Sequence, residues 1–420
     1  MKRSPWAWVP TLYFAEGLPY VAVMTISLIM YKRLGLSNTD ITLYTSWLYL
    51  PWVIKPLWRP FIDIIKTKRW WIVTMQLLIG AALGGVAFTI PASYWLQGSL
   101  AFFWLMAFSS ATHDIAADGF YMLGLRQHEQ AYFVGIRSTF YRIATIVGQG
   151  LLVMLAGNLE VVTRNIKYSW SLMFYGMAGL FIAFWLWHHY ILPRPKEDTQ
   201  GLSSHSILQE FWLTLKTFFQ KPQVWAGICF MLFYRMPEGL LAKVSALFLI
   251  DTTAKGGLGL SPAEYGLVQG TVGVIGLTIG GILGGIAASR DGLKHWLWPM
   301  VIAITLPDLV YVYLSSALPE NLFVVNICVF IEQFGYGFGF SAYMLYLIYY
   351  SQGEHKTAHY ALCTAFMALS MMIPGLFAGA LQESVGYPTF FLIVMAACSL
   401  TYIVSATLKI DPEFGKKKSE

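Results

Sequence analysis

The sequence predicts an all-α membrane protein with twelve transmembrane helices arranged as two pseudo-symmetric six-helix halves. Hydrophobic residues make up 57% of the 420-residue chain and charged residues only 12%, against about 25% charged residues in an ordinary soluble domain. The apolar residues gather in long stretches, and the longest hydrophilic stretch lies near the middle of the chain. These observations indicate a membrane protein that is divided centrally.

Each predicted span is long enough to cross a bilayer, which takes about 20 mostly apolar residues in a helix. We predict the twelve spans at residues 8–31, 41–62, 71–91, 99–123, 132–157, 170–191, 224–249, 264–288, 296–315, 322–349, 357–381 and 388–408. An even number of spans places both termini on one side of the membrane. The expected domains are a first half over residues 1–192, a linker over 193–223, a second half over 224–409 and a tail over 410–420.

The linker begins with LPRPKEDTQG and continues with SILQEFWLTLKTFF. In the second piece, apolar residues fall close to one face of a helix, namely Ile207, Leu208, Phe211, Leu215 and Phe218. We therefore expect an amphipathic helix that lies along the cytoplasmic surface of the membrane.

Lys and Arg predict the orientation of the chain, because basic residues in short loops stay in the cytoplasm. The termini and the loops on their side hold seventeen of these residues, whereas the opposite loops hold five: Lys32, Arg33, Arg164, Lys167 and Lys255. Both termini are therefore expected in the cytoplasm. The net charge of +6 is explained by this asymmetry and requires no nucleic-acid partner. The first segment is too long and too rich in Trp, Tyr and Glu for a cleaved signal peptide.

Catalytic signatures are missing from the sequence. It has no G-x-x-x-x-G-K-[ST] loop, no H-E-x-x-H motif and no G-x-S-x-G turn. Its four cysteines stand singly inside predicted spans without metal-ligand spacing, at Cys229, Cys328, Cys363 and Cys398. We expect packing roles for the cysteines, and no enzyme, cofactor or metal. Without a phosphate-binding loop, transport would run on a gradient or downhill.

Two six-helix halves with three-helix repeats resemble the major facilitator superfamily, in which the substrate site lies near the membrane midplane between the halves. In that architecture spans 1, 4, 7 and 10 line the central cavity, so ionisable residues at depth should concentrate there. The sequence has them at Glu16, at His113, Asp114 and Asp118, at Arg235, Glu238 and Lys243, and at Glu332. In the peripheral spans the exception is Asp308, for which the sequence offers no account beyond a partner in a neighbouring helix.

Asp114 and Asp118 are one helical turn apart and project to the same side of their helix. Close carboxylates at low dielectric favour a shared proton, so this pair is a candidate for proton coupling or substrate binding; a purely structural ion network is the alternative. The natural compensating charges are Arg137 and Arg142 on the next span. Asp118, nearer the cytoplasmic end, is expected to pair with Arg137, which leaves Asp114 as the better proton carrier. His113 is either a ligand or a hydrogen-bonding residue.

The seventh span carries Arg235, Glu238 and Lys243 around Pro237, and a kinked, charged helix of this kind suits a gate. The alternative is that Arg235 and Glu238, three residues apart, neutralise each other. In the tenth span Glu332 is followed by Gln333 and Tyr336. The rings of Tyr13, Tyr141 and Tyr336 fall on spans that could face the cavity, where ring faces suit sugars; packing is the alternative reading of each.

Several segments are similar to AmpG-like muropeptide permeases, the bacterial branch of the peptide/acetyl-coenzyme A transporter family within this superfamily. The fourth span reads SSATHDIAADGFYM, and further similarities are YFAEGLPY, KPLWRPFIDIIKTKRWW, FYRIATIVGQG, RMPEGLLAKVSALFLI and FIEQFGYGFGFSAYMLYL. Matched to the family pattern, the acidic signature falls on Asp114 and Asp118, and the other charged positions fall on Arg142, Arg235, Glu238 and Glu332. The departures are His113 for the usual Gln, Glu16 for a small polar residue, and Arg59 and Ser289 in loop motifs.

The resemblance implies proton-driven import of N-acetylglucosaminyl-1,6-anhydro-N-acetylmuramyl peptides for peptidoglycan recycling, by a monomer in the bacterial inner membrane. Its partners would be a muropeptide-like small molecule, protons and the lipid bilayer. We expect proton coupling at Asp114, Asp118, Glu332 and Glu16. We expect substrate binding at Arg142, Arg235, Glu238, Lys243, Tyr13, His113, Tyr141, Gln149, Gln333 and Tyr336. The alternatives are a transporter of another solute, such as a sugar, a peptide or a coenzyme A ester, and a membrane receptor or membrane-embedded enzyme.

Overall fold

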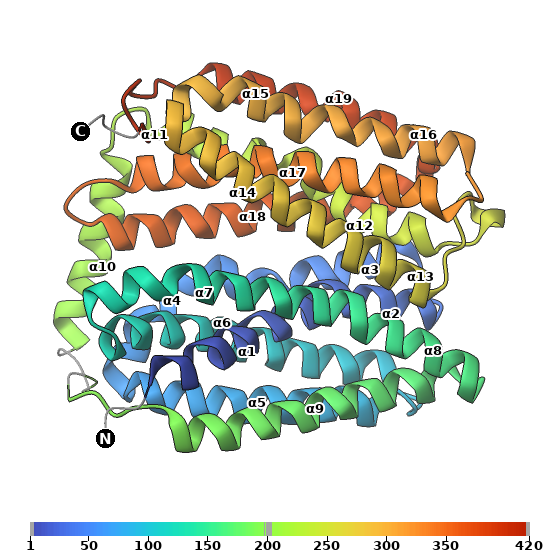
Figure 1. Cartoon of the computed structure of the whole chain (residues 1–420), viewed down its shortest axis with the longest axis horizontal. Helices are drawn as coiled ribbons and strands as arrows, with labels where there is room; N and C mark the ends of the chain where they lie inside the picture. The colour runs from blue at the N-terminus through green and yellow to red at the C-terminus, as the bar shows by residue number, and fades with distance from the viewer. Residues whose placement is uncertain (1–3, 197, 199–203, 417–420) are drawn as a thin grey trace. The chain divides into compact units, whose positions relative to one another are not determined.

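The computed structural model describes residues 4–196, 198 and 204–416, and this part of the chain is helical with no β-strand (Figure 1). The chain divides into two compact units. Unit 1 comprises Met1–Leu34 and Ile54–Phe211, and unit 2 comprises Gly35–Val53 and Trp212–Glu420. Each unit is described by itself below.

Unit 1 is built from long helices joined by short turns. Its elements are η1 (Pro5–Ala7), α1 (Val9–Val21), η2 (Ala22–Ile26), α2 (Ser27–Arg33), most of α4 (Leu50–Ile65), α5 (Lys68–Thr89), α6 (Trp95–Gly124), α7 (Gln127–Thr145), η3 (Ile146–Leu152), α8 (Val153–Thr163) and α9 (Ile166–Ile191). Helix α5 packs against α6 and α9, and α1 packs against α6 and α7. The segments η2 and η3 are π-helical turns within longer helices.

Unit 2 contains α3 from the early part of the chain and all of the later helices. Its elements are α3 (Asn38–Trp47), α11 (Val224–Phe233), α12 (Met236–Ile250), η4 (Thr253–Lys255), α13 (Pro262–Leu267), the π-helical η5 (Val268–Gly273), α14 (Val274–Asp291), α15 (Leu293–Thr305), η6 (Leu306–Asp308), α16 (Leu309–Ala317), α17 (Leu322–Ser351), α18 (Lys356–Val385) and α19 (Tyr387–Ala406). Helix α3 packs on α18.

Within the described residues, nine helical stretches are long and apolar enough to cross a membrane. The other three predicted spans coincide with α3 and α4, with α6, and with α11 and α12, and these stretches carry most of the deep charges noted in the sequence. Helices α3, α4, α11 and α12 are each too short to cross a membrane alone, whereas α6 is one continuous helix whose apolarity is lowered by His113, Asp114 and Asp118. This all-helical architecture is consistent with twelve spans and confirms the predicted fold class.

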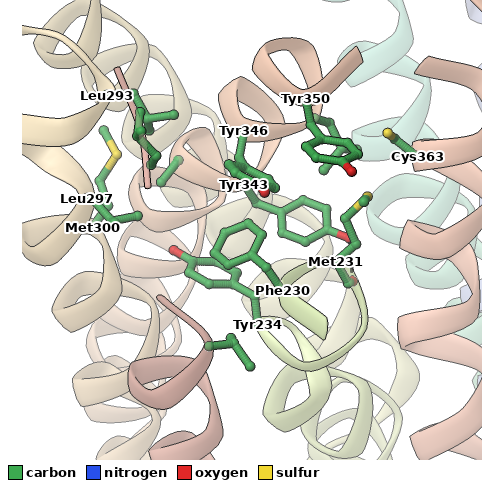
Figure 2. Packing of buried hydrophobic residues seen from close by; sticks show 14 of the residues in the cluster. Phe230, Met231, Tyr234, Leu293, Leu297, Met300, Tyr343, Tyr346, Tyr350 and Cys363 are labelled. Atoms are coloured by element: carbon green, nitrogen blue, oxygen red, sulfur yellow. Dashed lines mark hydrogen bonds between the residues drawn. The ribbon is translucent and has the colours of Figure 1, made fainter. Parts of the chain in front are cut away.

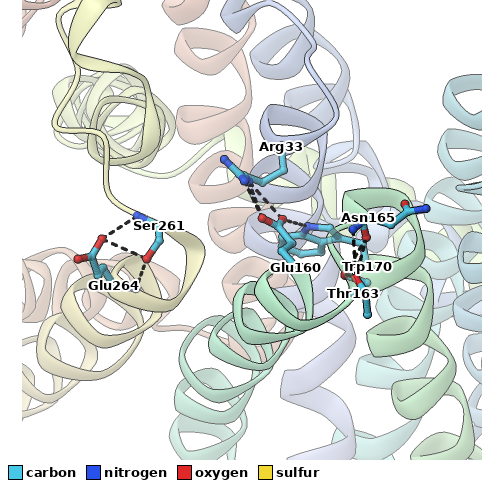
Figure 3. Close-up of polar contacts among 8 residues, drawn as sticks. Arg33, Glu160, Thr163, Asn165, Trp170, Ser261 and Glu264 are labelled. Carbon is cyan, nitrogen blue, oxygen red and sulfur yellow. Dashed lines mark hydrogen bonds and ion pairs between the residues drawn. The ribbon is translucent and has the colours of Figure 1, made fainter.

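Local sequence determines where several helices begin. Ser261 and Glu264 form a reciprocal cap at the start of α13, in which Ser261 accepts from the backbone N–H of Glu264 and Glu264 accepts from that of Ser261 (Figure 3). Such a cap satisfies donors that the first helical turn leaves free. The side chains of Ser37, Thr67, Asn165 and Asn321 cap α3, α5, α9 and α17.

An ion pair joins the ends of two helices in unit 1. Arg33, at the end of α2, donates to both carboxylate oxygens of Glu160 on α8, and its shortest contact, from Nη2, is 2.6 Å. The indole N–H of Trp170 on α9 donates to the same carboxylate at 2.7 Å (Figure 3). Three helices are therefore tied together at one carboxylate.

Glycines on α14 let it approach α17 closely. A Cβ built on Gly280 would lie 2.1 Å from the carbonyl oxygen of Phe334, and one on Gly284 would lie 2.7 Å from that of Phe338. Gly285 faces open space. The helical spacing of Gly276, Gly280 and Gly284 thus forms the contact face, because small residues allow helix backbones to come together.

An aromatic cluster lies between α11 and α17 in unit 2 (Figure 2). The ring centroids of Phe230 and Tyr346 are 4.5 Å apart, and those of Phe230 and Tyr234 are 4.7 Å apart. Tyr343 donates to the carbonyl of Met231 at 2.6 Å, and Tyr234 donates to that of Gly339 at 2.9 Å. These contacts fix the chain directly before Arg235.

The predicted linker helix is α10 (Ser204–Phe219). Phe218 is fully buried and packs against Tyr350, His359 and Phe366 of unit 2. The side chains of Ile207 and Leu208, also expected on the apolar face, lie outside the described residues. All four cysteines are free, and Cys229 is exposed whereas the other three are buried.

Candidate functional site

Three ionisable side chains meet inside unit 1. Glu16 lies on α1, and the neighbouring His113 and Asp114 lie on α6. One carboxyl oxygen of each acid and one imidazole nitrogen of His113 lie within 4.8 Å of one another. One carboxylate oxygen of Glu16 and Nδ1 of His113 are buried without a hydrogen-bond partner among the described residues. The cluster joins two groups expected to couple protons with one expected to bind substrate.

Asp114 has a cationic neighbour other than the arginines that the sequence suggested for it. Nζ of Lys55 on α4 lies 3.7 Å from Oδ2 of Asp114, and the two side chains are 28% and 15% exposed. Arg142 was expected to compensate this acid, but within the described residues it forms no ion pair or hydrogen bond. Helix α4 therefore supplies a cation beside Asp114.

Asp118 forms the ion pair with Arg137 that the sequence suggested. Nη1 of Arg137 lies 3.1 Å from Oδ1 of Asp118, and the hydroxyl of Tyr13 bridges the pair by donating to Asp118 at 3.3 Å and accepting from Arg137 at 3.0 Å. The guanidinium also lies over the rings of Tyr13 and Tyr121, 5.1 and 4.9 Å from their centroids. Tyr13 is thus engaged within unit 1.

The remaining expected residues of unit 1 lie on the helix formed by α7 and η3. Arg142 and Tyr141 are half-buried on α7, and Gln149 is half-buried in the π-helical turn η3. Tyr141 interacts electrostatically with Glu16 and Asp114. No hydrogen bond of Gln149 is present within the described part of the chain.

Sequence reasoning missed two polar residues that reach the acidic cluster. Gln76 on α5 bonds to His113, and His188 on α9 bonds to Gln76. All three side chains are fully buried. Their signal was present in the sequence, because a buried amide and a second histidine inside apolar spans are also costly, but neither residue carries the obligatory charge that marks the acids.

Arg235 of unit 2 is buried against aromatic rings rather than against a carboxylate. Its guanidinium carbon lies 4.6 Å from the ring centroid of Phe340, 5.6 Å from that of Tyr343 and 5.7 Å from that of Tyr336. It donates to the hydroxyl of Tyr336, and its Nε is buried without a partner. The described residues contain no ion pair between Arg235 and Glu238, so the mutual neutralisation considered for this pair is not the arrangement found.

Three buried carboxyl groups meet in unit 2: Glu238 on α12, Asp308 in η6 and Glu332 on α17. One carboxyl oxygen from each residue lies within 4.8 Å of the other two, and the residues are only 2 to 7% exposed. Gln333 donates to Glu332 at 2.9 Å. The isolated deep charge of Asp308 is thereby explained, because it joins two acids from spans expected to line the cavity. Oxygens at this separation can share a proton or hold a small cation.

Lys243, expected to bind substrate, is buried within unit 2. Its ammonium group donates to the hydroxyl of Thr45 on α3 at 2.7 Å and lies 5.4 Å from the ring centroid of Tyr49. This contact joins α12 to α3, so the charge serves the packing of these helices in this conformation.

The fold is that of a major facilitator transporter. The chain is similar to the solved structure of a D-xylose-proton symporter, with a TM-score of 0.70, 12% identity and coverage of 94% of this chain and 96% of that one. It is equally similar to the nucleoside transporter NupG, with a TM-score of 0.70, 14% identity and coverage of 96% and 98%. The Major Facilitator Superfamily model matches residues 236–420.

The chain belongs to the BT1 family, whose model matches residues 14–313. Its similarity to a named relative is more specific. The chain is 26% identical over 398 residues to the anhydromuropeptide permease of Escherichia coli strain K12, with coverage of 92% of this chain and 76% of the relative. This agrees with the AmpG-like motifs of the sequence.

Proposed function

We propose that this transporter couples the inward movement of protons to the import of anhydromuropeptides across the bacterial inner membrane, with both termini in the cytoplasm and the chain acting as a monomer. The similarity to an anhydromuropeptide permease supports the substrate class. The excess of Lys and Arg in the loops on the side of the termini supports the orientation.

The observation that carries the substrate assignment is the state of Arg235. A buried guanidinium without an ion-pair partner in the described residues is costly, and it is suited to bind a carboxylate through two parallel N–H groups. Muropeptides carry carboxylates on their peptide, and sugar rings lie beside that peptide. The aromatic rings of Tyr336, Phe340 and Tyr343 offer apolar faces on which sugar rings can pack.

The buried acids support proton coupling. The unit 1 cluster contains Glu16 and Asp114, and the unit 2 cluster contains Glu238, Asp308 and Glu332. Carboxylates placed this close in an apolar interior cannot all be ionised, so protons bind and leave these clusters as the local charge changes. Asp114 is the proposed carrier in unit 1, and Glu332 is the corresponding candidate in unit 2.

The test is uptake of a radiolabelled anhydromuropeptide into proteoliposomes, with and without an imposed inward proton gradient. Accumulation that depends on the gradient is expected. Absence of uptake by folded and correctly inserted protein would refute the muropeptide assignment, and uptake of a sugar, a peptide or a coenzyme A ester instead would identify the other solute. Uptake that does not depend on the gradient would refute proton coupling and leave the muropeptide assignment in place.

A further inference from the structure

A chain of hydrogen bonds crosses four helices of unit 1 and ends at the acidic cluster. The hydroxyl of Thr11 on α1 lies 2.9 Å from Nε2 of His188 on α9. Nδ1 of His188 lies 2.9 Å from Oε1 of Gln76 on α5. Nε2 of Gln76 lies 3.0 Å from Nε2 of His113 on α6. Thr11, Gln76 and His188 have no role in the substrate binding and proton coupling proposed for this transporter.

The amide of Gln76 assigns different roles to the two imidazoles. Its nitrogen only donates and its oxygen only accepts. Nε2 of His113 faces the amide nitrogen and must therefore offer its lone pair, so the proton of a neutral His113 ring lies on Nδ1. Nδ1 of His188 faces the amide oxygen and therefore donates, which leaves its Nε2 as an acceptor that faces the Thr11 hydroxyl. The carbonyl of Trp8, at 3.2 Å, is the second acceptor for that hydroxyl.

His113 is consequently limited in what it can do. Its Nε2 lone pair is occupied by Gln76, so it cannot take a second proton without breaking that bond. Its Nδ1–H is a donor that is fully buried and has no partner among the described residues. The acidic neighbours of the ring are Glu16 and Asp114, since one carboxyl oxygen of each lies within 4.8 Å of one of its nitrogens. One carboxyl oxygen of Glu16 is likewise buried without a partner among the described residues.

The charged and titratable groups around this point come from several helices. Asp114 is close to Lys55 of α4 at 3.7 Å, and Asp118 is held by Arg137 of α7 at 3.1 Å. Glu16 interacts electrostatically with all four of these groups but forms no ion pair within the part of the chain that the structure describes. Tyr13 of α1, Tyr141 of α7 and His188 of α9 complete the surroundings.

We propose that His113 is a fixed hydrogen-bond donor to the Glu16 and Asp114 pair, and that Gln76 and His188 are positioning residues that hold it in the Nδ1–H form. When the shared proton leaves the pair, the resulting carboxylate receives the N–H of His113, and no proton moves from the imidazole. His113 thereby favours proton release without carrying a proton. This role deepens the proposed proton coupling and rests on it, whereas the form of the ring can be tested without any transport.

The first experiment is nitrogen-15 NMR of histidine-labelled full-length protein in liposomes, with resonances assigned through His113→Gln and His188→Gln. We expect neutral His113 with its proton on Nδ1, and loss of that form in Gln76→Leu. A wild-type His113 with its proton on Nε2 would overturn the proposal. Because this readout needs no substrate, it remains decisive even if the muropeptide assignment fails.

The second experiment is the pH profile of gradient-driven uptake. Loss of a donor to a carboxylate makes the proton leave less readily, so His113→Leu and Gln76→Leu should each move the profile to higher pH by about one unit. The double variant should move no further than either single one. His113→Gln, which restores an N–H donor, should return the profile to that of the wild type.

A control separates this role from packing. His359 of unit 2 is also a buried histidine, and it contacts Thr217 at 3.0 Å. His359→Leu should leave the pH profile unchanged. Equal shifts in His359→Leu and His113→Leu, or additive shifts in the double variant, would show that these substitutions act by perturbing the fold, and the proposal would be wrong.

Discussion

Nζ of Lys55 lies 3.7 Å from Oδ2 of Asp114, and this contact joins α4 to the acidic cluster of unit 1. An ammonium group at this distance attracts a carboxylate, so α4 is held to α6 at the residue that is proposed to carry the proton.

Asp114→Asn should therefore abolish gradient-driven accumulation while leaving exchange of substrate across the liposome membrane, because the amide keeps the shape but binds no proton. Uptake with and without a proton gradient measures the accumulation, and a counterflow assay measures the exchange of substrate. Lys55→Met should retain coupling, because the carboxyl group that is proposed to bind the proton is unchanged. Accumulation by Asp114→Asn at the wild-type level would show that another group carries the proton.

Arg235 should govern substrate affinity. Replacement by Lys keeps the charge but removes the planar fork of donors and the stacking on Phe340, so Arg235→Lys should weaken substrate binding about tenfold or more. Substrate titration of purified protein measures this change. Lys221, which donates to the carbonyl of Tyr350, provides the control, since Lys221→Met should bind substrate normally.

The carboxyl groups of Glu238, Asp308 and Glu332 should not all be ionised. An Asn side chain has the shape of a protonated Asp carboxyl group. The free energy of unfolding of Asp308→Asn should therefore lie within about 1 kcal/mol of the wild-type value, whereas Asp308→Lys should fail to fold. Thermal unfolding in detergent tests this difference. A strong destabilisation by Asn would mean that Asp308 is charged and paired in the native protein.

Glu160 should contribute to the stability of unit 1. Glu160→Gln removes the charged acceptor of Arg33 and Trp170 and should lower the free energy of unfolding by about 2 kcal/mol. Glu413→Gln, in an exposed pair with Lys416 at 2.9 Å, is the matched control and should leave the melting temperature unchanged. Similar melting temperatures for both variants would contradict this role.

Gly280 and Gly285 should respond oppositely to alanine. A Cβ at Gly280 meets the backbone of Phe334, so Gly280→Ala should destabilise the protein by about 2 kcal/mol. A Cβ built on Gly285 would meet no described atom outside its own stretch of helix within 4 Å, and Gly285→Ala should be neutral or stabilising because alanine favours the helix. Thermal unfolding of the two variants compares the same chemical change five residues apart, and destabilisation of both would indicate a general intolerance of α14.

The fold class and family could be predicted from the sequence because span length and apolarity are properties of consecutive residues. Intramembrane charges also carry information, since their cost confines them to a few helices. The pairing of Asp118 with Arg137 followed from their places on consecutive spans. Which face of one helix meets another is set by packing, and for this reason Lys55, rather than Arg142, could not be identified as the neighbour of Asp114.

The histidine network escaped prediction for a different reason. Gln76 and His188 carry no obligatory charge, and they lie on spans expected at the periphery, so neither stood out among apolar residues. Asp308 did stand out, but its meeting with Glu238 and Glu332 depends on how three helices pack. In each case the residue type was visible in the sequence and its partner was not.

The π-helical turns η3 and η5 affect how this chain is aligned with other sequences. A π-helical turn holds one residue more than the α-helical turn that it replaces, so side chains on either side of residues 146–152 and 268–273 change register by about one position. Gap-free comparison across either turn matches residues on different helix faces. Wherever the matching helix of another sequence, or of the other half, is α-helical throughout, an alignment needs a single-residue gap at these turns to superimpose equivalent lining positions.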